Sequence, residues 1–201
     1  MTEFAYQVKV PKDRVAVLIG KNGETKKLLI ELTKTKIDID SNEGEVNVSG
    51  DDALNLYSTR EIIKAIARGF NPETALLLLK QDYAFDIINL PDFENPNQFL
   101  RIKGRVIGKD GKSRRLIEEF TETYISVYGK TVAFIGQVDT LFLARKAVEM
   151  LIKGSPHSNV YSWLERRKRE VKRREYEDDF SQHLRTKDDK KFAVPKEEPK
   201  E

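Results

Sequence analysis

The chain contains the stretch IGKNGETKKLLIELTKTKIDID at residues 19–40 and the stretch IGKDGKSRRLIEEFTETYISVY at residues 107–128. Both begin with Ile-Gly-Lys-x-Gly, continue with paired basic residues and apolar residues at helical spacing, and end in alternating apolar residues. Self-similarity of this kind indicates two copies of one structural unit. The fold therefore has to use the same Gly-x-x-Gly turn twice.

Each copy predicts the element order β-α-α-β-β-α. In the first copy, alternating apolar residues predict a strand at 4–10, followed by a short helix, the glycine turn and a second helix. Two short strands at 37–40 and 45–49 and a longer helix complete the unit. In the second copy the corresponding strands lie at 124–128 and 131–135. The sequence thus predicts an α+β protein with two repeated domains.

Composition shifts divide the chain further. Asn71 and Pro72 are favourable residues for starting a helix, and the leucines that follow predict a linking helix hidden between the two units. Beyond Gly154 the chain becomes basic and then charged throughout, which is typical of disorder. The predicted segments are a first domain at 1–70, the linking helix at 71–81, a second domain at 82–155, a basic helix at 156–176 and a disordered tail at 177–201.

The bulk composition excludes several classes of protein. The chain has 201 residues, a net charge of only +3 and no cysteine, so disulfides, thiol catalysis and thiolate metal sites are excluded. Its start lacks the pattern of a secretory signal, and no apolar run approaches the length that spans a bilayer. We expect a cytoplasmic protein without a membrane partner. Because the net charge is small, any contact with nucleic acid depends on where the basic residues cluster.

The Gly-Lys-Ser at 111–113 invites comparison with a nucleotide-binding loop of the pattern G-x-x-x-x-G-K-[ST]. The first glycine of that pattern would fall at Val106, and the first copy of the turn lacks Lys-Ser after its second glycine. No acid–base or metal-ligand constellation is visible among the Asp, Glu and His residues. The sequence predicts no enzyme, no catalytic residue, no metal and no cofactor.

The turn favours a phosphodiester instead. Its glycines leave room for an approaching backbone, and the helix that follows directs unpaired N–H groups and its positive dipole end to the same place. Basic residues beside the turn add charge, and neighbouring apolar residues are expected to form a groove for bases. The predicted RNA-binding residues are Val106, Ile107, Gly108, Lys109, Asp110, Gly111, Lys112, Arg114, Arg115, Ile125 and Val127 in the second copy, and Gly20, Lys21, Asn22, Gly23, Lys26 and Lys27 in the first; Leu116 joins the proposed groove.

This Ile-Gly-Lys-x-Gly turn within a β-α-α-β-β-α unit resembles the type I KH domain family, whose G-x-x-G loop clamps the backbone of about four single-stranded nucleotides. The run RVIGKDGKSRRLIEEFTETYISVYGKTVAFIG and the pattern Gly-Ser-Pro-x-x-x-Val-Tyr-x-x-Leu at 154–164 are similar to a narrower group. That group comprises the tandem-KH small-ribosomal-subunit assembly factors of archaea and eukaryotes, the "partner of Nob" proteins. The resemblance covers both repeats, roughly residues 3–70 and 82–154.

The resemblance implies a single-stranded RNA-binding protein that acts near the 3′ end of small-subunit ribosomal RNA. It also implies work beside the endonuclease that matures this end, and beside other ribosome or translation factors. Two alternatives stay open: a KH protein of another RNA machine, in RNA decay or transcription, and a KH-fold scaffold for protein interactions. The bound RNA sequence, the partner surfaces, the angle between the units and the oligomeric state are not given by the sequence.

The sequence also bears on which repeat dominates RNA binding. Eukaryotic members of the group have lost the G-x-x-G of the first repeat, whereas here Gly20-Lys21-Asn22-Gly23 is intact, so either unit could bind. Residues 103–115 hold six basic residues against one acidic residue, and residues 12–27 hold five against two. The denser charge favours the second repeat. For the basic helix, a solvated face, an RNA contact and a protein contact all remain open.

Overall fold

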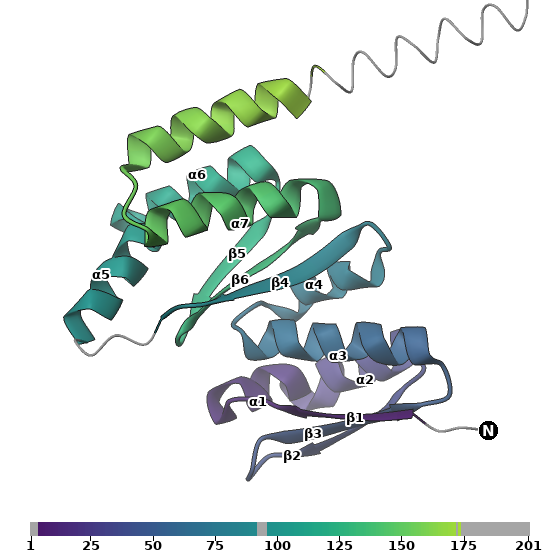
Figure 1. Cartoon of the computed structure of the whole chain (residues 1–201). Coiled ribbons are helices and arrows are strands. Elements are labelled where there is room, and N and C mark those ends of the chain that lie inside the picture. Colours follow the sequence, from purple (N-terminus) through teal and green to yellow (C-terminus); the bar gives the residue numbers. More distant parts are fainter. Residues whose placement is uncertain (1–3, 92–95, 172, 174–201) are drawn as a thin grey trace, which may run out of the picture.

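A computed structural model describes residues 4–91, 96–171 and 173 (Figure 1). The tail predicted at 177–201 and the last residues of the predicted basic helix lie outside these ranges. Among the helices of the described part, none combines the length and apolar character required to cross a bilayer.

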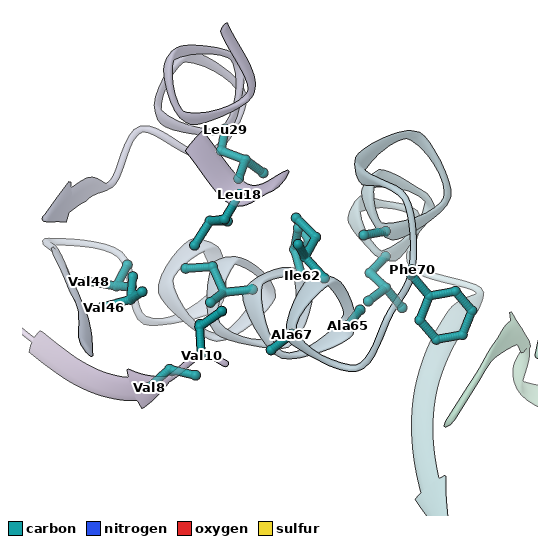
Figure 2. Close-up of a cluster of buried hydrophobic side chains, with 14 of the residues drawn as sticks. Val8, Val10, Leu18, Leu29, Val46, Val48, Ile62, Ala65, Ala67 and Phe70 are labelled. Atoms are coloured by element: carbon teal, nitrogen blue, oxygen red, sulfur yellow. The ribbon is translucent and has the colours of Figure 1, made fainter. Parts of the chain in front are cut away.

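The first unit has the predicted order of elements. They are β1 (Phe4–Lys9), α1 (Lys12–Ile19), a 3-10 turn η1 (Lys21–Gly23), α2 (Glu24–Thr33), β2 (Lys36–Asp40), β3 (Glu45–Gly50) and α3 (Ala53–Ala67). The strands form an antiparallel sheet in the order β1-β3-β2, with Val8 opposite Val46. Because side chains alternate along a strand, Val8, Val46 and Val48 point to one face, where α1, α2 and α3 cover them (Figure 2).

The second unit repeats this order. Its elements are β4 (Tyr83–Asn89), α5 (Pro96–Ile107), η3 (Lys109–Gly111), α6 (Lys112–Thr121), β5 (Tyr124–Tyr128), β6 (Thr131–Gln137) and α7 (Val138–Ile152). The sheet order is β4-β6-β5, again antiparallel. The predicted α+β class with two β-α-α-β-β-α domains is therefore confirmed.

The segment between the units is shorter and less regular than the helix predicted at 71–81. It contains one α-helical turn, α4 (Pro72–Ala75), followed by a 3-10 turn, η2 (Leu76–Leu79). Leu78 is buried in the core of the first unit, whereas Leu79 is exposed. Within the 3-10 turn the four leucines point in different directions, because a 3-10 helix has about three residues per turn.

A last helix covers the second unit. Residues 157–171 are helical, and Val160 and Leu164 of this helix are buried in the core of the second unit. The Lys168 ammonium donates to the carbonyl oxygen of Glu119 at 3.2 Å, near the C-terminal end of α6. Figure 1 shows the resulting stack of layers: the first sheet, its helices, the second sheet, its helices and the last helix.

Strand β6 packs into two cores. Val132 and Phe134 belong to the core under α5, α6 and α7, while Ala133 and Ile135 belong to the core of the first unit. Tyr83, Phe85 and Ile87 of β4 pack on the same side as Ala133 and Ile135. In the first sheet the corresponding outward positions are polar or small, namely Ala5, Gln7, Asn47 and Ser49. Only the second sheet is therefore apolar on both faces, and the first unit covers its outer face.

Polar contacts complete the junction between the units. Ser126 Oγ donates to the carbonyl oxygen of Arg68 at 2.8 Å, and the Tyr128 hydroxyl donates to Asp13. The hydrogen bond to Asp13 raises the pKa of Tyr128, because the bond favours the protonated phenol. Phe70 contacts Phe85 edge to face, with ring centroids 6.4 Å apart. The two units are thus fixed to each other by side chains from both.

Gly69 offers a test of this junction. Its φ is +99°, and a Cβ there would lie 2.6 Å from Ser126 Oγ and 3.1 Å from Tyr128 Cβ. Gly154 occupies the corresponding place after α7, with φ of +96° and no atom within 4 Å of a Cβ. We expect Gly69→Ala to lower the free energy of unfolding by about 1–3 kcal/mol more than Gly154→Ala does, measured by guanidinium unfolding. Equal losses would mean that the junction tolerates the methyl group and that only backbone strain is measured.

Candidate nucleic-acid interface

Each Gly-x-x-Gly turn begins with a glycine in a conformation that other residues avoid. Gly20 has φ 76° and ψ 175°, and Gly108 has φ 76° and ψ 172°, a region populated almost only by glycine. A Cβ at Gly20 would lie 2.2 Å from Thr25 Oγ1, and one at Gly108 would lie 2.6 Å from Ser113 Cβ. The first glycine is thus required for the chain to turn tightly against the next helix.

The last two residues of each turn are left-handed. Asn22 and Asp110 have φ of 56° and 52°, and the second glycines, Gly23 and Gly111, have φ of 77° and 75°. Asn and Asp tolerate this region better than other side chains, which explains their choice here. No atom lies within 4 Å of a Cβ built on Gly23. The outer side of the first turn is therefore bare backbone, open to an approaching chain.

Helices α2 and α6 start directly at these turns. Gly23 and Gly111 are their N-terminal caps, and neither helix receives a hydrogen bond from a capping side chain. A helix start of this kind presents backbone N–H donors and the positive end of the helix dipole. Both turns therefore direct the same donors to the surface beside their second glycine.

An open hollow lies beside each turn. The first has a volume of about 590 Å³ and the second about 550 Å³. The first is lined by Lys21, Asn22, Glu24, Lys27, Leu28 and Glu31, and the second by the corresponding residues Lys109, Asp110, Lys112, Arg115, Leu116 and Glu119. The acidic and basic residues balance in the first hollow, whereas the second keeps an excess positive charge. Charge at the hollows thus favours anion binding at the second turn.

Two predicted arginines have different surroundings. Arg115 Nη2 donates to the backbone carbonyl of Asp110, and its Nε lies 3.7 Å from a Cβ built on Gly111, so its guanidinium lies over the turn. Arg114 Nε instead lies 3.6 Å from Glu118 Oε2. Burial raises the pKa of Glu118, whose carboxylate accepts the Ile125 N–H at 2.8 Å. Arg115 belongs to the hollow, and Arg114 is held beside Glu118.

The predicted base groove is wrong at two positions. Val106 is 0% exposed and Ile125 is 4% exposed, and both lie in the core of the second unit. Val106 sits on the face of α5 that packs inside, and Ile125 pairs with Phe134 in the sheet. A side chain inside the core cannot also line an open groove. Ile107 and Val127 are only partly buried, and Leu116 lines the second hollow.

The other predicted residues lie on the surface around the turns. Lys21, Asn22, Lys27, Lys109, Asp110 and Lys112 line the hollows, while Lys26 lies on α2 outside them. The acidic residues Glu24, Glu31 and Glu119, also in the hollows, were not among the predicted residues. The sequence could have indicated two of them through helical spacing. Glu31 and Glu119 come four residues after Lys27 and Arg115, which places each pair on one face of its helix. In the described part of the chain, no group of three or more acidic or His side chains is placed to hold a metal ion.

Two arginines that were counted in the sequence among the basic residues near the turns stabilise the fold. Arg14 donates to the carbonyl oxygens of Ile66 and Phe70, at 2.9 and 2.6 Å. Arg105 donates to those of Leu151 and Ser155, at 3.3 and 2.6 Å. Each therefore satisfies backbone acceptors at the end of the last helix of its unit.

We expect Arg105→Met to lower the free energy of unfolding by about 1–3 kcal/mol, because it removes hydrogen bonds to buried carbonyls and retains the apolar stem. RNA affinity should change less than about threefold, because Arg105 does not line the hollow. Guanidinium unfolding and fluorescence anisotropy with a short RNA measure the two effects. A large loss of affinity at unchanged stability would place Arg105 at the RNA.

Two open glycine turns at helix starts, each within a β-α-α-β-β-α unit, define a protein with two KH domains, the class that binds single-stranded nucleic acid through G-x-x-G loops. Comparison with known families agrees. A model described as "KH domain" matches residues 5–68, and one described as "Eukaryotic type KH-domain (KH-domain type I)" matches residues 84–169.

Comparison with individual proteins shows which KH proteins this chain is similar to. The KH domain-containing protein MJ0443 of Methanocaldococcus jannaschii is 45% identical over 85% of this chain and 77% of its own length. Dim2p of Pyrococcus horikoshii, solved in an a/eIF2alpha–aDim2p–rRNA complex, is 47% identical with a TM-score of 0.79 over 84% of this chain and 96% of that chain. The pre-rRNA-processing protein PNO1 of Chaetomium thermophilum is 32% identical over 52% of this chain.

The chain belongs to the family of tandem KH-domain proteins that includes archaeal Dim2 and eukaryotic PNO1. The resemblance seen in the sequence is thereby confirmed. The chain spans 42% of the length of the Chaetomium relative, whereas it covers nearly all of the Pyrococcus chain.

Proposed function

We propose that this protein binds a single-stranded segment near the 3′ end of small-subunit ribosomal RNA and acts in the cytoplasm during assembly of the small subunit. The second Gly-x-x-Gly turn is the principal site, and the first turn is auxiliary. The observation that carries the proposal is the second turn itself, where a glycine turn beside the Arg115 guanidinium, a helix start and a hollow with excess positive charge coincide.

The mechanism is capture of the RNA backbone. A phosphate approaches Gly111, where no side chain except that of Arg115 lies near, and accepts hydrogen bonds from N–H groups at the start of α6. Lys109, Lys112 and Arg115 supply positive charge around it. Leu116 offers an apolar contact for a base in the same hollow. Phosphate contacts fix the position of the strand, and base contacts determine which sequence is held.

The first turn has the same backbone but a hollow whose charges cancel. Its affinity for RNA is therefore expected to be lower and less dependent on salt. This difference makes the second turn the better candidate for the principal contact.

Partners follow from the relatives. PNO1 of Chaetomium is named a pre-rRNA-processing protein, and the Pyrococcus protein was solved with rRNA and a/eIF2alpha. We infer that this chain likewise acts beside a translation-factor subunit. The resemblance stated from the sequence adds the endonuclease that matures the rRNA end as a second proposed partner.

Crosslinking in cells tests the proposal. The protein is irradiated in its own cells, and crosslinked RNA is sequenced. We expect crosslinks enriched at the 3′ end of small-subunit rRNA and carried by peptides around residues 107–116. Scattered messenger sequences would point to another RNA machine, and an absence of crosslinks would point to a protein scaffold.

A further inference from the structure

A group of large side chains is exposed on the first unit, away from the residues of the turn and its hollow. Phe4 and Tyr6 of β1 are 45% and 41% exposed, and Leu54 and Tyr57 of α3 are 78% and 53% exposed. Phe4 and Tyr6 lie two residues apart and so share one face of β1. Phe4 is opposite Gly50, just before α3, and in Figure 1 the start of β1 and the start of α3 lie at the same end of the unit.

Arg60 joins these side chains. Its guanidinium carbon lies 4.8 Å from the centroid of the Tyr6 ring and 5.1 Å from that of the Tyr57 ring. Its Nε and Nη2 donate to Glu61 at 3.1 and 3.0 Å. Stacking and an ion pair thus fix the arginine between two tyrosines. We call Phe4, Tyr6, Leu54, Tyr57 and Arg60 the tyrosine–arginine surface.

The second unit shows that the fold does not require this surface. In the positions of Phe4, Tyr6 and Leu54 it has Ala84, Asp86 and Asp139, and only Phe142 retains an aromatic ring in the place of Tyr57. Arg145, which corresponds to Arg60, forms an ion pair with Asp86 at 2.5 Å. The second repeat therefore has an ion pair and a single exposed ring, Phe142, at this place, whereas the first repeat exposes four large side chains there.

The composition of the surface is that of a protein interface. Tyrosine and arginine are among the residues that contribute most often to binding hot spots, and side chains already fixed before binding lose little freedom on contact. Strand β1 also lies at the edge of its sheet, and within the described residues no strand pairs with its outer side. An edge strand offers backbone donors and acceptors to an extended segment of a partner.

Charge selects the kind of partner. Asp51 and Asp52 are exposed beside Leu54, and Glu61 forms ion pairs with both Arg60 and Lys64. This acidic border repels phosphates and attracts lysine or arginine. Exposed aromatic rings would otherwise also suit stacked RNA bases, so the acidic border is what separates the two classes of ligand.

We propose that the tyrosine–arginine surface docks a partner protein through an apolar segment that carries lysine or arginine beside it. This contact stands apart from the proposed RNA function, since neither hollow contributes a residue to it. The chain would thus bind RNA through its glycine turns and bind a partner protein through β1 and α3 of its first unit.

Site-specific photocrosslinking of the full chain tests this. The photoreactive residue benzoylphenylalanine replaces Leu54, and as a matched control it replaces Leu100, which is 63% exposed on α5 of the second unit. Both proteins are irradiated in their own cells, and the crosslinked peptides are sequenced by mass spectrometry. We expect position 54 to crosslink to an apolar segment of another protein with lysine or arginine near the contact, and position 100 not to reach that segment.

Two exposed substitutions check the contact chemically. Tyr57→Ser and Asp51→Lys, each combined with the photoreactive residue at 54, should lower the yield of that crosslink at least about tenfold, while RNA affinity stays unchanged. Crosslinks from position 54 to RNA, to a second copy of this chain or to an acidic segment would overturn the proposal. The proposal would also be overturned if the crosslink yield from position 54 were no higher than that from position 100, or if neither substitution lowered it.

Discussion

Replacing Lys109 by Asp should reduce the affinity for single-stranded RNA about 10- to 100-fold. The change removes one charge-assisted contact, worth roughly 1.5–3 kcal/mol, and places a second carboxylate beside Asp110 in the turn. The hollow then changes from a positive to a negative net charge. The dependence of log affinity on log salt should also fall by about one unit. Fluorescence anisotropy with an RNA of about ten nucleotides measures both quantities.

The matched control is the same sequence in the other turn, Lys21→Asp with Asn22→Asp. Because the first hollow has no excess positive charge, we expect a loss below about threefold there. Lys109, Lys21 and Asn22 are all exposed, so none of these changes should disturb folding. A loss at the first turn equal to or larger than that at the second would reverse our assignment of the principal site.

Replacing Gly108 by Ala should destabilise the protein by about 2–4 kcal/mol and remove most of its RNA binding. The backbone of Gly108 lies in a region that alanine avoids, and a Cβ would come within 2.7 Å of the Ser113 nitrogen. Relief of this contact requires α6 to move away from α5, which displaces the N–H groups that face the phosphate. Guanidinium unfolding and anisotropy measure the two effects.

Gly104 provides the control for this substitution. It lies within α5, and a Cβ there would meet no atom within 4 Å. Gly104→Ala should therefore raise the free energy of unfolding by about 0.5–1 kcal/mol, the usual gain when alanine replaces glycine in a helix. If Gly108→Ala proved as harmless as Gly104→Ala, the tight approach of the turn to Ser113 would not be needed for the fold.

The turns and the element order could be predicted from sequence because their causes are local. Glycine pairs, alternating apolar residues and helical spacing each act within a few residues, and the repeat supplied an independent check. The two sheets and the helices beside each turn therefore appeared as expected. The apolar outer face of the second sheet, which includes Phe85 and Ile87, was not predicted, because its partner lies in the first unit.

What the sequence could not decide was which apolar or basic residue lies inside. Val106 comes just before the turn and Ile125 follows α6, but their direction depends on how α5 and β5 pack, and both point into the core. Arg14 and Arg105 belong to basic clusters, yet they bond carbonyls at the far end of their units, 46 to 56 residues away. Such contacts arise only from the tertiary fold.

Because β6 contributes side chains to both cores, the two KH domains are expected to fold and unfold in a single cooperative transition rather than independently. Cutting the chain at residue 82 would expose Phe85, Ile87 and Ile135 on the outer face of the second sheet, and fragments of that kind tend to aggregate. The spacing and direction between the two glycine turns are then set by the protein. An RNA strand that reaches both of them has to fit a spacing that the protein fixes.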